Sequence, residues 1–135
     1  MSVDYTALEP GQAISKRTYR LDDETVSDYL AAVGDSSPLQ IKADGRALVP
    51  PMALAALSLR GVVQDLDIPG GTIHVGQELE FMGSVTLRSR LDCQATLLQN
   101  SVRGEWRFIV VGLNVVDLDE RKSVMMGKST ITLPV

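Results

Sequence analysis

Residues 52–66 read MALAALSLRGVVQDL, and this stretch decides the fold. Apolar residues lie nearly all round the helix that it would form, whereas a helix on the surface of a globular protein keeps one polar face. The stretch begins after Pro50-Pro51 and stops before Pro69-Gly70-Gly71, both typical boundaries of a helical segment. The pattern therefore predicts a helix that is wrapped by other structure.

The sequence after this helix alternates between apolar and polar residues in a way that predicts four strands. They cover Ile73 to Phe81, Val85 to Leu97, Trp106 to Val116 and Ser123 to Leu133. Because the apolar helix has to be covered, and a curved antiparallel sheet is the only large apolar surface available, we expect the sheet to wrap the helix. The predicted fold class is α+β, with the hot-dog arrangement of a long antiparallel sheet around a central helix.

The N-terminal part predicts two further elements. Pro10-Gly11 is a turn signal, and Ala13 to Leu21 suits a short edge strand or an extended arm. A helix follows, with Asp22 as its N-cap and Gly34 as the residue just past its C-terminus. Leu21 and Val26 stand where a hydrophobic staple forms, and apolar residues then recur at helical spacing: Val26, Tyr29, Leu30 and Val33.

Size and charge limit the classes of function. The 135 residues suit one domain, 1–135, and the composition, 44% hydrophobic and 22% charged, is that of a soluble globular protein. The net charge of −4 and the scattered basic residues argue against nucleic acid as a partner. The sequence contains no apolar run of about 20 residues, and its start lacks a basic and then apolar leader. We expect a cytoplasmic protein that does not associate with membranes.

The chain has one cysteine and one histidine, Cys93 and His74. A disulfide within the chain is therefore excluded, and a zinc site built from these residue types is implausible. Cys93 falls among alternating apolar residues, so we expect a small core side chain. No metal and no cofactor are expected.

The loop Gly34-Asp35-Ser36-Ser37-Pro38-Leu39-Gln40 carries the functional signal, together with Leu48-Val49-Pro50-Pro51-Met52 and the strand His74-Val75-Gly76-Gln77 through Phe81. In this order and spacing the motifs resemble the MaoC-like hot-dog hydratases and dehydratases, most closely the N-terminal dehydratase half of the fatty-acid-synthase type. The likeness extends over most of the chain, from about Arg17 to Pro134. Residues 35–51 are expected to be a long loop with a short helical turn near Ile41 to Arg46.

The resemblance implies that the chain binds an acyl thioester, carried by coenzyme A or by an acyl carrier protein. Catalytic relatives have an Asp and a His in this loop, which together add water to the acyl chain or remove it. Asp35 matches the Asp, whereas Gln40 stands at the His position and has no proton to exchange near neutral pH. The resemblance places substrate at Pro38 and Pro51, and the thioester carbonyl at the amides of Met52 and Ala53, which a helix N-terminus leaves unpaired.

Two roles remain open for Asp35: a residual general base, or a turn residue that bonds to nearby backbone amides. Gln40 is either a former catalytic position or an ordinary polar loop residue. Plain alternation places His74 opposite Ile73, Val75, Leu79 and Phe81, on a face turned to solvent or to a partner. Arg88 and Arg90 are either phosphate contacts or part of a solvated strand face. Met125 and Met126 are either acyl contacts or gap fillers in the core.

Three functions follow from these alternatives. The first is a MaoC-like hot-dog protein that binds an acyl thioester, impaired or weak on its own, which supports a catalytic subunit in a heterodimer or pairs with itself in a homodimer. The second is a hot-dog acyl-CoA thioesterase, with Asp35 as the only candidate carboxylate. The third is a non-catalytic module that senses acyl-CoA. If the chain is an enzyme, we expect a lyase of fatty acid metabolism.

Overall fold

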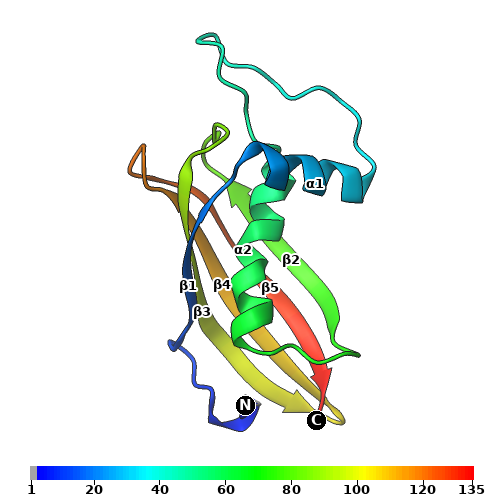
Figure 1. Cartoon of the computed structure of the whole chain (residues 1–135). Coiled ribbons are helices and arrows are strands. Elements are labelled where there is room, and N and C mark those ends of the chain that lie inside the picture. Colours follow the sequence, from blue (N-terminus) through cyan, green and yellow to red (C-terminus); the bar gives the residue numbers. More distant parts are fainter. Residues whose placement is uncertain (1–2) are drawn as a thin grey trace.

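The computed structural model describes residues 3–135, which form one antiparallel sheet and two helices (Figure 1). The strand order in the sheet is β1-β3-β4-β5-β2, and α2 lies against its concave face. The elements are, in chain order, η1 (Tyr5–Ala7), β1 (Ala13–Arg20), α1 (Asp23–Val33), α2 (Pro51–Asp65), β2 (Ile73–Phe81), β3 (Arg90–Arg103), β4 (Trp106–Asp117) and β5 (Lys122–Pro134). This is the predicted hot-dog arrangement.

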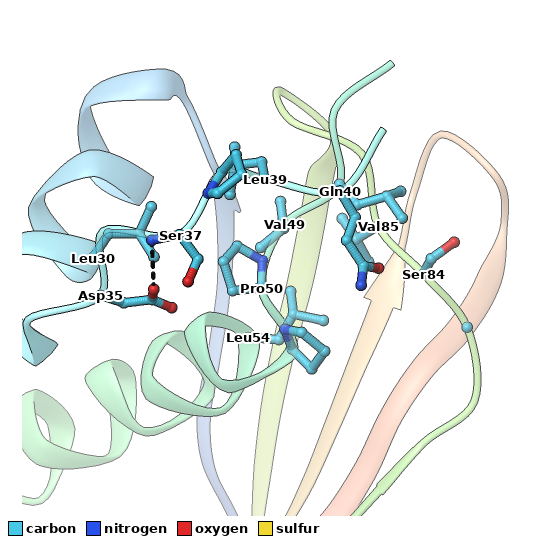
Figure 2. A pocket seen from close by; sticks show the side chains of 14 residues that line it. Leu30, Asp35, Ser37, Leu39, Gln40, Val49, Pro50, Leu54, Ser84 and Val85 are labelled. Carbon is cyan, nitrogen blue, oxygen red and sulfur yellow. Dashed lines mark hydrogen bonds between the residues drawn. The ribbon is translucent and has the colours of Figure 1, made fainter. Parts of the chain in front are cut away.

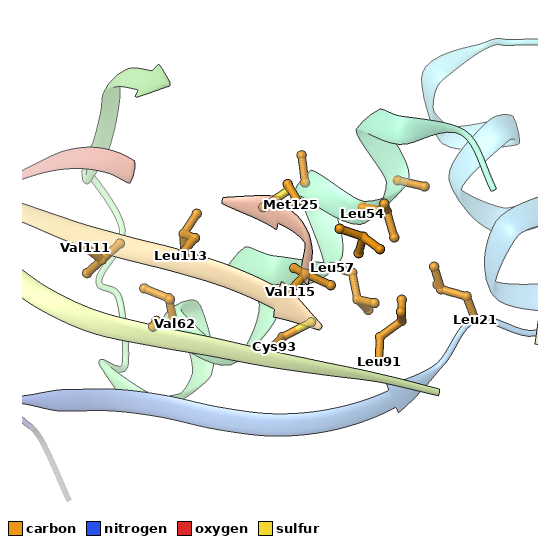
Figure 3. Close-up of a cluster of buried hydrophobic side chains, with 14 of the residues drawn as sticks. Leu21, Leu54, Leu57, Val62, Leu91, Cys93, Val111, Leu113, Val115 and Met125 are labelled. Carbon is orange, nitrogen blue, oxygen red and sulfur yellow. The ribbon is translucent and has the colours of Figure 1, made fainter. Parts of the chain in front are cut away.

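The central helix α2 is covered on one side only. Its buried side packs mainly against β1, β3 and β4, and its side chains there join the core drawn in Figure 3. On the other side Met52 is 50% exposed and Val63 is 52% exposed. The sheet wraps the helix as predicted, but its five strands curve over only part of the helix surface, so one side of α2 stays open.

The start of the chain matches the sequence-based predictions. β1 is an edge strand that pairs with β3 alone. The Asp22 carboxylate accepts the Thr25 N–H at 2.8 Å and so caps α1. Gly34 ends α1 with φ = +71°, a left-handed conformation that costs glycine little because it has no Cβ.

The predicted strand from Val85 to Leu97 begins later than expected, at Arg90, and runs on to Arg103. Val85 is buried, but it lies in the irregular segment 82–89, where Arg88 has φ = +70°. From Arg90 onward the alternation holds, and one face enters the core: Leu91, Cys93, Ala95 and Leu97. Cys93 is 4% exposed, which confirms that it is a core residue.

A β-bulge in β2 changes which of its side chains face α2. His74 pairs with Ile131 and Gly76 pairs with Thr130, so Val75 has no direct partner on β5. Directly paired residues of antiparallel strands lie on the same face. The buried Met125 pairs with Phe81, and along β5 the same face carries Gly127, Ser129 and Ile131, the partners of Leu79, Gln77 and His74.

His74 therefore shares the α2 side of the sheet with Leu79 and Phe81, and the prediction that it lies opposite them was wrong. Ile73 pairs with Thr132 on the outer face, so it does not share a face with Leu79 either. The extra residue at the bulge exchanges the faces of everything before it, because side chains alternate with a period of two. Val75 itself is 52% exposed at the open edge of the sheet.

The long connection 35–50 is a loop, as expected, but it contains no helical turn. Ile41 and Ala47 form an isolated antiparallel bridge around a tight turn, in which the Lys42 N–H donates to the Arg46 carbonyl at 2.9 Å. Gly45 supplies the positive φ that this turn needs. None of the helices in the described part of the chain has both the length and the apolar character that a membrane crossing requires.

Candidate functional site

A hollow of about 310 Å³ lies at the N-terminal end of α2, beneath the loop 35–50 (Figure 2). Its walls are mostly apolar, with Leu30 from α1, Leu54 from α2, and the side chains of Leu39, Leu48, Val49 and Val85. The polar groups on its lining are few and come from Asp35, Ser37, Gln40 and Ser84. An apolar hollow with a few polar groups is the usual form of a small-molecule site.

Two segments that are far apart in the sequence hold the hollow in shape. The Val49 N–H donates to the Val85 carbonyl at 2.8 Å, and the Leu87 N–H donates to the Ala47 carbonyl at 3.0 Å. These bonds tie the end of the loop 35–50 to the irregular segment 82–89. The wall formed by Gly83, Ser84 and Val85 was not expected from sequence, because Gly83 and Ser84 fell between two predicted strands and Val85 was predicted to begin the second.

Asp35 lines the hollow, but its carboxylate serves the backbone. Oδ1 accepts the Ser37 N–H at 2.9 Å, and the Asp35 N–H itself donates to the Leu30 carbonyl at the end of α1. The backbone hydrogen bond from Ser37 lowers the pKa of the Asp35 carboxyl below its usual value. A carboxylate with a lowered pKa is a weaker base, so the geometry favours the turn role for Asp35.

Gln40 lines the hollow on the side of Ser84 and Val85, with Pro50 and Leu54 between it and Asp35 in Figure 2. Its backbone carbonyl accepts the Leu48 N–H at 2.8 Å. Within residues 3–135, no hydrogen bond joins Asp35 to Gln40. The loop therefore brings both predicted positions to one hollow without forming a hydrogen-bonded pair between them.

The helix start supplies part of what the sequence predicted. Pro38 and Pro51 line the hollow, whereas Met52 and Ala53 do not. Ala53 instead borders a separate hollow between α1 and α2. The Ala53 N–H is not unpaired, since it donates to the Pro50 carbonyl at 2.9 Å in a tight first turn. No side chain caps this helix end, so of the two predicted amides only that of Met52 remains a candidate donor.

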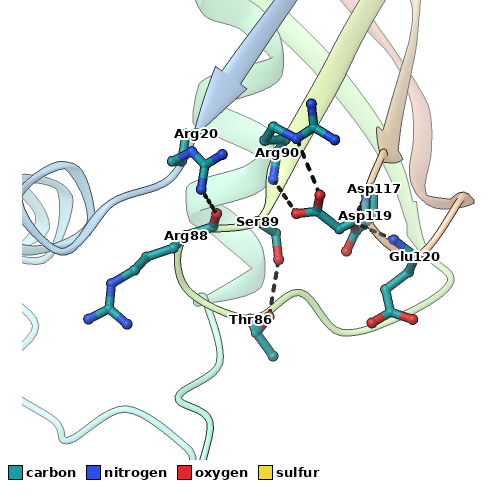
Figure 4. Close-up of polar contacts among 8 residues, drawn as sticks. All are labelled: Arg20, Thr86, Arg88, Ser89, Arg90, Asp117, Asp119 and Glu120. Carbon is teal, nitrogen blue, oxygen red and sulfur yellow. Dashed lines mark hydrogen bonds and ion pairs between the residues drawn. The ribbon is translucent and has the colours of Figure 1, made fainter.

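Other candidate residues have structural partners. Arg90 pairs with Asp119 at 3.2 Å, as Figure 4 shows, and Arg88 pairs with Asp23 at 2.8 Å. Neither arginine therefore presents an uncompensated charge to a phosphate. Burial raises the pKa of the Cys93 thiol to about 12, which leaves it inert. Met125 is fully buried in the core. Among residues 3–135, no three His, Cys, Asp or Glu side chains gather closely enough to hold a metal ion.

A second hollow, of about 300 Å³, lies at the other end of α2 against the start of β2. Its apolar walls include Leu59 and Val62 of α2 and Ile131 of β5, and the side chains of Thr72 and His74 complete it. Sequence reasoning missed this site, because it placed His74 on the opposite face of the strand. Only the bulge at Val75 could have revealed it, and a bulge leaves no clear sequence signal here.

No family model matches the chain, and no curated protein matches its sequence. Solved structures match its fold along nearly its whole length. Unliganded R-hydratase PhaJ1 from Pseudomonas aeruginosa is 23% identical, with a TM-score of 0.81 over 98% of this chain and 86% of that chain. The (R)-hydratase from A. caviae involved in PHA biosynthesis is 22% identical, with a TM-score of 0.77 over 95% and 98%.

A third solved structure is the C-terminally truncated HadBC (3R-hydroxyacyl-ACP dehydratase) complex from Mycobacterium tuberculosis. It is 14% identical, with a TM-score of 0.73 over 98% of this chain and 100% of that chain. At these identities the likeness concerns the fold. The hot-dog fold class is confirmed, and so is the predicted resemblance to MaoC-like hot-dog hydratases and dehydratases at the level of structure.

Proposed function

We propose that this chain is the acyl-binding, catalytically impaired half of a hot-dog hydratase or dehydratase that acts on acyl thioesters. One observation carries the proposal. The apolar hollow under the loop 35–50 has the shape of a substrate site, but its two predicted catalytic positions hold a turn-forming Asp35 and a Gln40 that cannot exchange a proton.

The hollows at the two ends of α2 support an acyl thioester as the ligand. The first contains Leu54 and the second contains Leu59 and Val62, so they are separated by about 8–12 Å along the helix axis. Leu79 and Phe81 lie on the face of β2 that is turned toward α2, and Phe81 is 38% exposed. In our proposal the thioester occupies the first hollow and a medium-length acyl chain follows α2 into the second.

The missing acid–base chemistry limits what the chain does alone. Adding water to an enoyl thioester requires one group that takes a proton and one that gives it. Asp35 is a weakened base and Gln40 is not an acid, and losing one such partner lowers a rate by about 10²–10⁴-fold. We therefore expect binding without appreciable turnover from the isolated chain.

A catalytic partner would complete the site. Among the described residues β2 pairs only with β5, and its other edge lies open beside the exposed side of α2. Open strand edges with exposed apolar residues are surfaces on which another chain can add a strand. The HadBC structure is a complex of two subunits, which suggests by analogy a hot-dog partner, either a second copy or a separate catalytic subunit.

The test combines binding and turnover. Crotonyl-CoA binding is measured by calorimetry, and its hydration is followed by the loss of enoyl absorbance, for the wild type, Asp35→Asn and Gln40→His. We expect the wild type to bind without hydrating, Asp35→Asn to change binding little, and Gln40→His to raise the hydration rate. Hydration by the wild type that Asp35→Asn abolishes would contradict the proposal.

A steric variant checks the location of the ligand. Ser84 lines the first hollow, so Ser84→Trp should fill the hollow and abolish crotonyl-CoA binding. Ser27→Trp is the matched control, because Ser27 is an exposed residue of α1 that does not line the hollow. Equal loss of binding in both variants, or in neither, would place the ligand elsewhere. A thiol reagent added to the turnover assay detects release of free coenzyme A thiol, the outcome expected for a thioesterase.

A further inference from the structure

The second hollow is not purely apolar, and its polar groups lack partners. The Thr72 hydroxyl group is buried, and it neither donates nor accepts a hydrogen bond among the described residues. His74 borders the same hollow as an exposed residue, so the buried group without a partner here is the Thr72 hydroxyl. A buried polar group without a partner is costly, so native structures rarely leave one without a reason.

The bulge at Val75 brings His74 to the second hollow beside Thr72. Thr72 immediately precedes β2 and lines the second hollow, and the bulge places His74, the second residue of β2, on the side that faces α2. Without the extra residue His74 would lie on the outer face, beside Glu78 and Glu80. Bulges commonly re-aim a side chain next to a functional site.

We propose that Thr72 and His74 recognise a hydrogen-bonding group, a hydroxyl or a keto oxygen, at the far end of the acyl chain. This rests on the proposed function, because the acyl chain reaches the second hollow only if its thioester lies in the first. A hydroxyl side chain both donates and accepts, and a neutral imidazole carries one donor and one acceptor. Together they suit an oxygen that the apolar walls from Leu59, Val62 and Ile131 shield from water.

The distance between the two hollows determines which acyl chains the protein can distinguish. A short chain such as crotonyl ends before the second hollow, because about 8–12 Å of α2 separates the two sites. A plain medium-length acyl chain reaches it and covers the Thr72 hydroxyl and the His74 ring, but offers neither of them a hydrogen bond. A site that is built to bond a polar group discriminates against the analogue that lacks it for this reason.

The experiment compares octanoyl-CoA with ω-hydroxyoctanoyl-CoA, by calorimetric binding to the full chain. We expect the wild type to bind the hydroxylated chain about tenfold more tightly. His74→Leu and Thr72→Val should each remove most of this preference while leaving octanoyl-CoA binding unchanged or stronger. Glu80→Gln is the control, because Glu80 lies on the outer face of the same strand, and it should keep the preference.

The outcomes separate this inference from the proposed function. If octanoyl-CoA binds and Ser84→Trp blocks it, but the wild type does not prefer the hydroxylated chain, recognition of a distal polar group is wrong and acyl binding stands. A preference that survives in the His74→Leu, Thr72→Val double variant also overturns the inference. If neither chain binds, the proposed function fails and this inference fails with it.

Discussion

The two edges of the sheet are built in opposite ways. β1 is an edge strand, yet α2 packs against it and Ser15 is buried there. β2 is the other edge, and most of its residues are exposed, including Val75 at its bulge. An edge strand whose outer hydrogen-bonding groups are unpaired can associate with another chain, so proteins normally cover such an edge or place charges on it. The difference indicates that β1 closes the fold, whereas β2 is held by β5 alone and is available to a partner.

The largest expected effect comes from Gly127 of β5, which pairs with Leu79 in the neighbouring strand β2. A Cβ at Gly127 would collide with the Glu78 carbonyl oxygen and approach the Leu79 side chain to 2.9 Å. Backbone cannot move aside as a side chain does, so Gly127→Ala should lower the free energy of unfolding by about 3 kcal/mol. Gly76→Ala is the matched control, because a Cβ at Gly76 meets nothing within 4 Å. Urea unfolding measures both, and equal stability of the two variants would contradict the close approach of β5 to β2.

Ion pairs at the two edges provide the next comparison. Lys16 pairs with Asp92 at 2.7 Å beside β1, where the Asp92 side chain is only 7% exposed. Lys128 pairs with Glu78 at 3.2 Å beside β2, where the Glu78 side chain is 75% exposed. Lys16→Met removes the counter-charge of a nearly buried carboxylate, which keeps the hydrogen bond from Gln94, and should cost about 2 kcal/mol of unfolding free energy. Lys128→Met should lower the free energy of unfolding by less than about 0.5 kcal/mol. If it lowered that free energy more than Lys16→Met does, the β2 edge and not the β1 edge would be the one that is closed.

The pH dependence of stability tests the ion pair between Lys16 and Asp92 further. Burial alone raises the pKa of Asp92, but hydrogen bonds from Lys16 and Gln94 outweigh it and leave that pKa below its usual value. A carboxyl with a lowered pKa in the folded state stabilises the protein above its unfolded pKa, of about 3.9, and the stabilisation is lost as the pH falls below that value. The stability gap between the wild type and Lys16→Met, measured by urea unfolding at neutral and at acid pH, should therefore shrink on acidification. A gap that is constant with pH would mean that the lysine acts through packing.

The smallest effect on folding is expected at the open edge itself. Val75→Lys should change the free energy of unfolding of the single chain by less than about 0.5 kcal/mol, because Val75 is exposed and unpaired. It should nevertheless weaken association, since a lysine on an edge strand opposes pairing with another strand. Sedimentation over a range of protein concentrations measures this. Unchanged association would show that a partner, if one binds, uses another surface.

The sequence predicted those parts in which local chemistry and period agree. Asp22 and Gly34 mark the ends of α1 because capping and a positive φ depend on single residues. Cys93 was placed in the core because β3 keeps a regular alternation there. The loop 34–40 was identified as functional for a different reason. It occurs in the same order and spacing as the Pro50-Pro51 segment and the His74 strand in the family that the chain resembles.

The features that the sequence did not predict depend on contacts between distant segments of the chain. The face of His74 was wrong because one unpaired residue, Val75, breaks the period of two. The Ala53 amide was wrongly expected to be free because a tight first turn of α2 uses it. The wall from Gly83 to Val85 could not be predicted, since it is held by hydrogen bonds from Val49 to Val85 and from Leu87 to Ala47, which no local pattern encodes.

The paired prolines at the start of α2 have a consequence for ligand affinity. Both Pro50 and Pro51 line the first hollow, and each ring fixes its own φ near −65°. Proline reduces the conformational freedom of the unfolded chain, so less entropy is lost when this segment becomes ordered. The part of the hollow that they form is consequently rigid before any ligand arrives. A bound thioester need not order it, and more of the contact energy then remains as affinity.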